Sequence, residues 1–284
     1  MNNIDRRVVK AFGEEWSKFD CSQLEHPDLR TLFESYFSLF PWHELPPNAE
    51  GFDLGCGTGR WAHFAAQRVQ HLHCIDASAA ALDVARRNLH MHTNCSFYCN
   101  SVEAIPLADS CMDFGYSLGV LHHVPDLQQG VNECMRILKL GAPLLLYLYY
   151  AFDNRPVWYR IIWRASDFVR RFISTLPFAI KSVLCELIAA LIYWPLARIS
   201  RLFEKLKVDT NLFPLSAYRN RSFYSMRTDA LDRFGSRLEK RFTRNEIKRI
   251  METAGFERIV FSESPCWCVL GYRKADQTGR LSNA

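Results

Sequence analysis

Three glycines at alternate positions, Gly55, Gly57 and Gly59, are the first residues whose spacing suggests chemistry. Glycine permits the sharp turns that bring a main chain close to a ligand. A helix expected from about residue 60 would point its free N–H groups and the positive end of its dipole at that ligand. Asp76 follows a second apolar run, 23 residues after Asp53. An acid at the tip of a second strand can accept hydrogen bonds from both ribose hydroxyls, which predicts a nucleoside-bearing ligand.

The elements that must position these groups lie between residues 50 and 150, where short apolar runs alternate with amphipathic segments. The expected strands are 50–54, 71–75, 95–99, 112–118 and 143–150, and the expected helices are 60–69, 78–91 and 127–138. Such alternation predicts a parallel sheet with helices on both faces. Ligands bind such sheets at the carboxyl ends of the strands, which is where the glycine turn and Asp76 fall.

A glycine turn followed by an acid fits two cofactor classes. Dinucleotide sites usually need G-x-G-x-x-G, but here Arg60 stands at the position of the third glycine. The order D-x-G-x-G-x-G over residues 53–59, with C-I-D-A-S at 74–78, resembles motifs I and II of the class I S-adenosylmethionine (SAM)-dependent methyltransferases, of the methyltransferase type 11 kind. The resemblance continues through V-E-A-I-P-L (102–107), D-S-C-M-D-F (109–114), S-L-G-V-L-H-H-V (117–124) and L-K-L-G-A-P-L (138–144). It covers about 50–150 and resumes at about 243–274.

This resemblance implies an α/β fold, a Rossmann-like, seven-stranded and mostly parallel sheet with helices on both faces, here with a mainly helical insertion. It implies SAM as the cofactor and S-adenosylhomocysteine as its product. Ser101 stands where many relatives have an aspartate that accepts a hydrogen bond from the adenine amino group. The residues expected at the cofactor site are Asp53, Gly55, Cys56, Gly57, Gly59, Asp76, Ala77, Ser78, Ser101, Val102, Leu118 and Gly119. No C-x-x-C pair occurs among the ten cysteines, so we expect no metal site.

The chemistry that the resemblance implies is an in-line displacement at a methyl group, for which the protein mainly aligns the reactants. An alcohol or a protonated amine also needs a base, which typically contributes ~10²–10⁴-fold. All nine histidines precede residue 124, and His122 and His123 end the fourth expected strand. We take His123 as the first candidate base, His122 as the second and Tyr224 as a further one. The alternative is that the histidine pair is structural.

Two segments outside the core are expected to cover the site. Residues 1–48 form a predicted helical cap, in which Phe12, Trp16, Tyr36 and Trp42 either wall the pocket or only pack the helices on the core. Residues 151–242 form a predicted helical lid with helices near 158–169, 178–194 and 196–206. The apolar run 183–194 carries Glu186 and is too short to cross a membrane, so it is either a buried lid helix or an interfacial one.

Basic residues gather in this insertion. Residues 1–150 carry a net charge of −6, whereas residues 151–242 carry +9. This asymmetry predicts a surface for anions or a membrane face, or simply a solvated arginine-rich bundle. Arginine suits bidentate contacts with carboxylates and phosphates, which favours an anionic acceptor. The expected acceptor-binding residues are Tyr150, Tyr218, Arg219, Tyr224 and Arg227.

The last part of the chain is expected to complete the sheet. Thr243 and Glu246 have the spacing of a capping box that opens a helix ending at Gly255. A hairpin should follow, so that 49–150 and 243–274 form one core, with a flexible tail over 275–284.

We therefore predict a SAM-dependent methyltransferase acting on a small, anionic acceptor such as an acidic sugar, a nucleotide-sugar, a lipid-linked intermediate or a carboxylate or thiol metabolite. One alternative is a nucleic-acid methyltransferase, although the chain has no N-P-P-Y or D-P-P-Y motif. Another is a non-catalytic protein that binds a membrane surface or a partner on the same scaffold. The scattered cysteines and the polar start predict a cytoplasmic protein with possible peripheral membrane contact.

Overall fold

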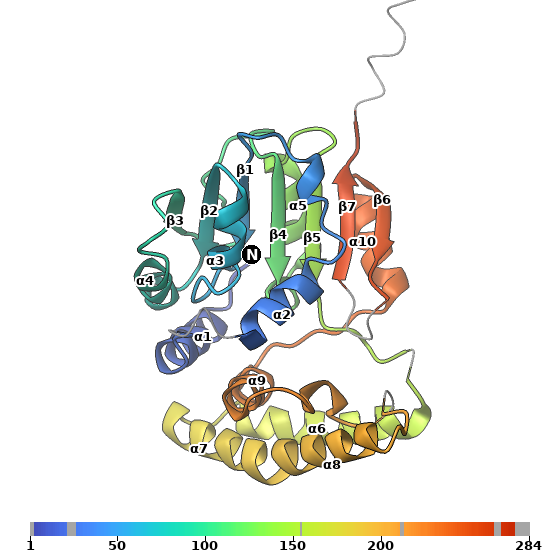
Figure 1. Ribbon diagram of the computed structural model, residues 1–284. Helices are drawn as coiled ribbons and strands as arrows, with labels where there is room; N and C mark the ends of the chain where they lie inside the picture. The colour runs from blue at the N-terminus through green and yellow to red at the C-terminus, as the bar shows by residue number, and fades with distance from the viewer. Residues whose placement is uncertain (1–2, 22–26, 154, 211–212, 264–267, 276–284) are drawn as a thin grey trace, which may run out of the picture.

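A seven-stranded sheet forms the centre of the protein (Figure 1). The computed structural model describes residues 3–21, 27–153, 155–210, 213–263 and 268–275. The strands lie in the order β3-β2-β1-β4-β5-β7-β6. The first five are mutually parallel, and β7 is antiparallel to both of its neighbours. Their bounds are β1 (Glu50–Leu54), β2 (His71–Asp76), β3 (Cys95–Cys99), β4 (Phe114–Leu118), β5 (Pro143–Tyr147), β6 (Phe256–Phe261) and β7 (Cys268–Arg273). The predicted fold class is confirmed.

Two apolar cores cover the two faces of this sheet. One core joins Phe52 and Leu54 to α5 (Leu127–Ile137) and α10 (Arg244–Ala254). The other joins Phe114 and Tyr116 to α2 (Pro27–Tyr36), α3 (Ala62–Ala65) and α4 (Ala79–Asn88). Alternate residues of a strand point to opposite faces, so each strand supplies both cores. The helix expected over 60–69 is shorter, because α3 gives way to a 3-10 turn over Ala66–Arg68.

Glycine and phenylalanine alternate between the two central strands. Gly51 is opposite Phe114, and Phe52 is opposite Gly115. A Cβ atom on Gly51 would lie 2.2 Å from the Phe114 ring, and one on Gly115 would lie 2.1 Å from the Phe52 ring. Each ring therefore occupies the space above a glycine of the neighbouring strand, once on each face of the sheet.

The remaining helices stand at the carboxyl ends of the parallel strands (Figure 1). The chain begins with α1 (Arg6–Lys18), and after β5 it continues into α6 (Val157–Ile173), α7 (Phe178–Ile188), α8 (Trp194–Lys205), a 3-10 turn over Ser216–Tyr218 and α9 (Phe223–Gly235). We call α6, α7, α8 and α9 the helical layer. A third apolar core holds this layer together, and Phe19, which follows α1, joins it.

One expectation about this layer was wrong. The sequence indicated two helices separated at Pro195, with an apolar run too short to span a bilayer. Instead α7 and α8 form one continuous helix, Phe178–Lys205, of 28 residues, which by length and composition could cross a membrane. A π turn over Ala189–Tyr193 precedes the proline, and the N–H of Trp194 bonds to the carbonyl of Ala189. This wider turn leaves room where a proline ring would otherwise meet the preceding turn of the helix.

The final segment has the predicted order of a helix followed by two strands. Thr243 caps α10, and its side chain and that of Glu246 form both bonds of the capping box. Gly255 ends the helix at φ +99°, a left-handed conformation that glycine adopts without strain. The turn around Pro265 and residues 276–284, which make up most of the predicted tail, lie outside the described residues.

Candidate functional site

A cavity of about 580 Å³ lies between the carboxyl ends of the parallel strands and the helical layer. Its walls come from the loops after β1, β2, β4 and β5, from α1 and from α9, elements that are far apart in the sequence. Its size falls in the range of pockets that hold a cofactor together with a small ligand. The predicted site residues that line it are Gly55, Cys56, Gly57, Asp76, Ala77, Ser78, Ser101, Val102, Leu118, Gly119, His123, Tyr150, Tyr218 and Arg219.

The glycine turn and Asp76 form one hydrogen-bonded unit at the floor of the cavity. Gly55 and Gly57 have φ of +79° and +54°, which explains glycine at both positions. The N–H of Gly57 donates to Oδ2 of Asp76 at 2.9 Å, and the N–H of Ser78 donates to Oδ1 at 2.8 Å. Burial raises the pKa of Asp76, and these two bonds counteract that rise. Each carboxylate oxygen keeps a further lone pair with which to accept a ribose hydroxyl.

Two predicted cofactor residues, Asp53 and Gly59, are not among the residues that line the cavity. Asp53 is buried at the end of β1, and its Oδ2 has no hydrogen-bond partner among the described residues. Burial raises the pKa of this carboxyl to about 8. Gly59 (φ +77°) packs under the turn, where a Cβ atom would lie 2.8 Å from the Leu89 side chain. Gly59 thus allows the turn to pack closely on Leu89, and Asp53 lies buried at the end of β1 before the turn.

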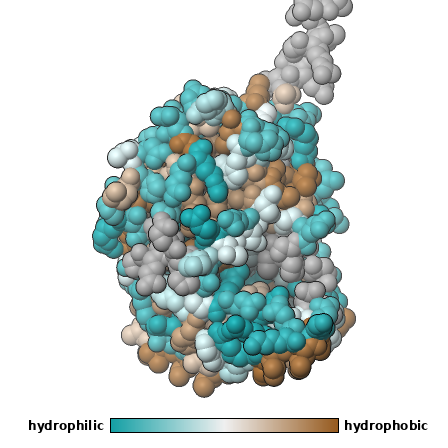
Figure 2. Space-filling view, viewed as in Figure 1, coloured by the Kyte–Doolittle hydropathy of each residue, from teal (hydrophilic) through white to brown (hydrophobic). Residues whose placement is uncertain are grey.

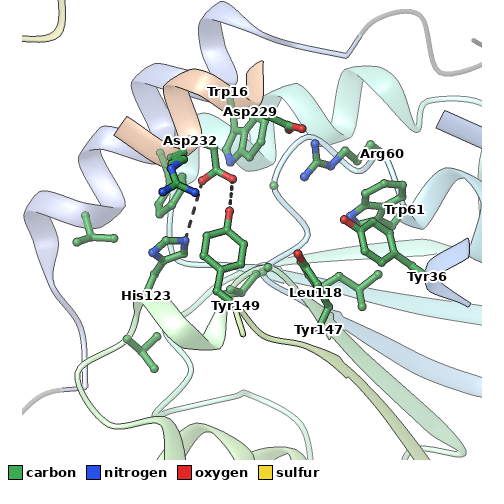
Figure 3. Close-up of a pocket in the computed structure, with 18 of the residues that line it drawn as sticks. Trp16, Tyr36, Arg60, Trp61, Leu118, His123, Tyr147, Tyr149, Asp229 and Asp232 are labelled. Atoms are coloured by element: carbon green, nitrogen blue, oxygen red, sulfur yellow. Dashed lines mark hydrogen bonds and ion pairs between the residues drawn. The ribbon is translucent and has the colours of Figure 1, made fainter. Parts of the chain in front are cut away.

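His123 and Asp232 are neighbours in the wall of the cavity (Figure 3). Nε2 of His123 lies 4.0 Å from Oδ1 of Asp232, and the hydroxyl of Tyr149 donates to Oδ2 of Asp232 at 2.7 Å. Nδ1 of His123 lies 2.5 Å from the carbonyl oxygen of Leu238, so this nitrogen carries the proton. Nε2 therefore holds the lone pair, and it has no hydrogen-bond partner among the described residues.

The electrostatics of His123 suit a proton acceptor. Burial lowers the pKa of His123, and the nearby Asp232 carboxylate partly counteracts this. A neutral imidazole with an unshared Nε2 lone pair can take a proton from a bound molecule, and a carboxylate within about 4 Å would stabilise the cation that results.

His122 lies away from the cavity wall. It is fully buried, and its ring stacks on Tyr149 with a centroid separation of 3.8 Å. Burial and the neighbouring His123 lower its pKa strongly. Of the predicted pair, the structure brings His123 to the cavity and places His122 behind it as a packing residue.

Two predicted acceptor residues, Tyr224 and Arg227, also lie outside the cavity wall. The ring of Tyr224 packs edge-on against Phe19, and Arg227 pairs with Glu186 at 2.8 Å. The reason is local, because both residues lie on helix α9. A helix turns residues three and four apart to one side. Asp229, Asp232 and Arg233 consequently face the cavity, whereas Tyr224 and Arg227 face α1 and α7.

Sequence reasoning missed Asp232, Arg60 and Arg241 at this cavity. A signal for Asp232 was present in its spacing of three residues from Asp229, had the segment been taken as a helix. Arg60 lies over the rings of Trp16 and Trp61, at 4.9 and 4.8 Å from their centroids (Figure 3).

The aromatic residues of the N-terminal segment divide between two roles. Phe12, Trp16 and Tyr36 line the cavity. Trp42 instead packs in the core beneath, 5.3 Å from the Phe37 ring. The four aromatic residues singled out in this segment therefore include three at the cavity and one in the core.

Comparisons with known proteins agree with this geometry. The family model of the methyltransferase domain matches residues 52–146. A malonyl-[acyl-carrier protein] O-methyltransferase of Pectobacterium atrosepticum is 27% identical over 186 residues, which are 65% of this chain and 69% of that protein. A ubiquinone biosynthesis O-methyltransferase of Hahella chejuensis is 26% identical over 146 residues, 51% of this chain and 61% of that protein. The alignments thus span 69% and 61% of the lengths of these two relatives.

A solved structure shows the same fold. The methyltransferase of Haloferax volcanii, in complex with the Trm112 activator, superposes with a TM-score of 0.51 at 12% identity and covers 93% of this chain and 98% of that chain. Among the described residues no group of three or more His, Cys, Asp or Glu side chains could hold a metal ion. The glycine turn, the acid after the second strand and the family match agree, and residues 52–146 of this chain form a methyltransferase domain of the class I SAM-dependent type.

Proposed function

We propose that this methyltransferase methylates a hydroxyl group of a small acceptor, with His123 as the general base. The observation that carries the proposal is His123 at the cavity wall, whose buried Nε2 has no hydrogen-bond partner among the described residues and lies 4.0 Å from the Asp232 carboxylate. A hydroxyl must lose its proton during methyl transfer, whereas a carboxylate acceptor would need no such base. The names of two relatives agree with an oxygen acceptor, although the malonyl group named in one of them offers a carboxylate and not a hydroxyl.

Different residues of the cavity would bind the cofactor, accept the proton and stabilise the resulting charge. Asp76 and the glycine turn would hold the ribose and the methionine half of SAM, while the backbones near Ser101 and Val102 would meet the adenine. When bound, SAM supplies a methyl group on a positively charged sulfur that leaves readily. Nε2 of His123 would accept the hydroxyl proton as the acceptor attacks. Asp232, held by Tyr149, would stabilise the resulting imidazolium.

We further propose that the acceptor is anionic. Among the described residues six arginines and four aspartates line the cavity, and Asp76 is assigned to the cofactor. Arg219 and Arg241 are paired with Glu204 and Glu239, each at 2.7 Å. Arg60 forms no ion pair within 4.0 Å with a described residue, so its guanidinium is available for a carboxylate or a phosphate. Tyr150, Tyr218 and Arg219 would contact the remainder of the acceptor. We also propose that the protein acts in the cytoplasm and contacts a membrane surface.

The first test is calorimetric titration of the protein with SAM and with S-adenosylhomocysteine. We expect micromolar binding by the unchanged chain and a loss of at least about tenfold in Asp76→Ala, because hydrogen bonds to a charged group contribute ~1.5–3 kcal/mol each. Asp83→Ala, an exposed change on α4 next to the site, is the matched control. Equal affinity in Asp76→Ala and the unchanged chain would contradict the assigned cofactor site.

A second measurement addresses the acceptor. S-adenosylhomocysteine production is followed with hydroxy acids and sugar phosphates and with their neutral analogues. Turnover restricted to the anionic hydroxylated compounds supports the proposal. Turnover of acceptors that lack a hydroxyl would exclude it.

A further inference from the structure

The outer surface of the helical layer is unusually apolar. Among the described residues 22 large hydrophobic side chains are exposed, and 17 of them lie between residues 157 and 208. Phe168 on α6 and Leu191 on the π turn are 78% and 72% exposed. Figure 2 shows brown, hydrophobic side chains gathered along the lower edge of the molecule, where α7 and α8 lie. An apolar surface that extends over several helices marks an interaction site on a folded protein.

These side chains form a continuous stripe. On the long helix Phe178–Lys205 the exposed residues Ile180, Val183, Leu187 and Leu191 recur every three or four positions. The stripe continues beyond the π turn through Ile199 and Leu202. A spacing of three to four residues places a set of side chains on one side of a helix. We call this stripe, together with the exposed apolar residues of α6, the outer face.

The opposite side of the same helix is fixed to the protein. Cys185, Ala189 and Ala197 are buried in the core of the helical layer. Glu186 pairs with Lys18 of α1 at 2.6 Å and with Arg227 of α9 at 2.8 Å. The helix therefore lies along the body of the protein with one face outward. This arrangement suits a helix that rests on a bilayer and does not suit one that crosses it.

The charge around the outer face is positive. Residues 157–207 contain nine basic and three acidic side chains. The three acids are all in ion pairs, Asp167 with Arg170, Glu186 with Lys18 and Glu204 with Arg219. Exposed basic residues stand beside the stripe, among them Arg160, Arg164, Arg201 and Lys205. Arginine and lysine next to apolar side chains complement anionic headgroups above a hydrocarbon layer.

From this pattern we infer that the outer face binds the surface of a bilayer that contains anionic lipid, with α6 and the long helix lying parallel to it. Exposed Trp158 and Trp194, on α6 and α8, would lie at the level of the headgroups. The cavity is close to this surface. Tyr159 and Tyr193 line the cavity, whereas their chain neighbours Trp158 and Trp194 are exposed. One layer of helices thus separates the reaction site from the proposed membrane.

The test is flotation of the full chain with vesicles of phosphatidylcholine alone and of phosphatidylcholine with 30% phosphatidylglycerol, a fraction of about a third that gives a strongly negative surface. We expect flotation with the anionic vesicles. A variant with Val183→Glu, Leu187→Glu and Leu191→Glu should lose at least about tenfold of this binding, because it places three acids on the stripe. Met91→Glu with Leu140→Glu is the matched control, because both residues are exposed and lie on the core domain. It should bind as the unchanged chain does.

Each result supports or contradicts the inference. Circular dichroism and the unfolding midpoint show whether the variants are folded, and no assay here depends on SAM. Arg201→Gln with Lys205→Gln should weaken binding to the anionic vesicles only. The inference fails if the folded triple variant floats like the unchanged chain, or if the unchanged chain does not float. It also fails if light scattering shows a dimer that the triple variant dissociates without any vesicle binding, because the outer face would then contact a second copy.

Discussion

At the scale of single residues, a half-buried carboxyl, a buried carboxyl and one imidazole lie in different environments. Asp76 is held by two backbone N–H groups, while Asp53 has an oxygen without a partner among the described residues. His123 donates from Nδ1 to the Leu238 carbonyl and so keeps the lone pair on Nε2, next to Asp232. Local hydrogen bonding therefore sets what each group can do.

For His123 we predict that replacement by glutamine lowers kcat by about 10²–10³-fold, because the proton acceptor is removed. The affinity for SAM should remain within about twofold, since Asp76 and the glycine turn are unchanged. Single-turnover kinetics and calorimetry measure the two quantities. His43→Gln, a change at an exposed histidine, is the control.

The dependence of the rate on pH provides a second test, because it would not change if His123 served only in packing. Asp232 raises the pKa of His123, so Asp232→Asn should move the acidic limb of the rate profile to lower pH. An unchanged rate in His123→Gln, or an acidic limb that moves to higher pH in Asp232→Asn, would contradict the base assignment.

For Asp53 we predict a measurable effect of pH on stability. Its folded pKa of about 8 lies above the ordinary value of 3.8, so the folded chain keeps a proton that the unfolded chain has lost. Stability from this group consequently falls as pH rises from about 4 to 8, and between pH 6 and pH 8 the loss is about 2 kcal/mol.

Urea denaturation at pH 6 and pH 8 measures this loss as a change in the free energy of unfolding. Asp53→Asn should remove that part of the pH dependence, whatever its effect at a single pH. Asp83→Asn serves as an exposed control. If the free energy of unfolding falls equally between pH 6 and pH 8 in Asp53→Asn and in the unchanged chain, Asp53 is not the cause of the pH dependence.

At the scale of elements, the central strands pack through the glycine and phenylalanine pairs. We predict that Gly115→Ala lowers the free energy of unfolding by about 1–3 kcal/mol, because its Cβ would lie 2.1 Å from the Phe52 ring. Urea denaturation measures the loss. Adding Phe52→Leu should recover part of it, so that the double variant is more stable than the sum of the single effects. Additive losses would show that the ring is not the cause.

The elements of the core were predictable from the sequence, and those of the layer were less so. Strands such as β2 and β5 are short apolar runs with turns beside them, and the glycines mark the loop after β1. The continuity of α7 and α8 was missed because a proline usually ends a helix, and here a π turn accommodates it. Helix α9 was missed because its polar residues suggested a loop, although Met226, Ala230 and Leu231 are buried on one side.

The residues of the candidate site were likewise only partly predictable from the sequence. Asp76 and the glycines could be assigned from motif spacing, because their roles arise from local backbone geometry. Asp232 could not, since it reaches His123 from 109 residues farther along the chain, and only tertiary packing sets that distance. Tyr224 and Arg227 were assigned to the acceptor from composition, which does not say which side of a helix faces the cavity.

At the scale of the whole molecule, the cavity lies between the sheet core and the helical layer. The chain leaves the sheet after β5, forms the helical layer and returns to finish the sheet with β7 and β6. Contacts of α1 with α4 and α9 connect the core to the layer, as does the ion pair of Lys18 with Glu186. A change in the layer could therefore alter the cavity without touching the cofactor turn.

The insertion of β7 beside β5 has a consequence for the protein as it leaves the ribosome. The outer edge of β5 contains three successive buried leucines at 144–146, and its partner in the finished sheet begins at Cys268. About 120 residues must be translated before that edge is paired, which takes roughly ten seconds at ordinary rates of synthesis. During this interval the nascent chain exposes an apolar strand edge, the feature that most readily recruits other chains. Completion of the last strand thus protects the nascent protein from aggregation as well as closing its fold.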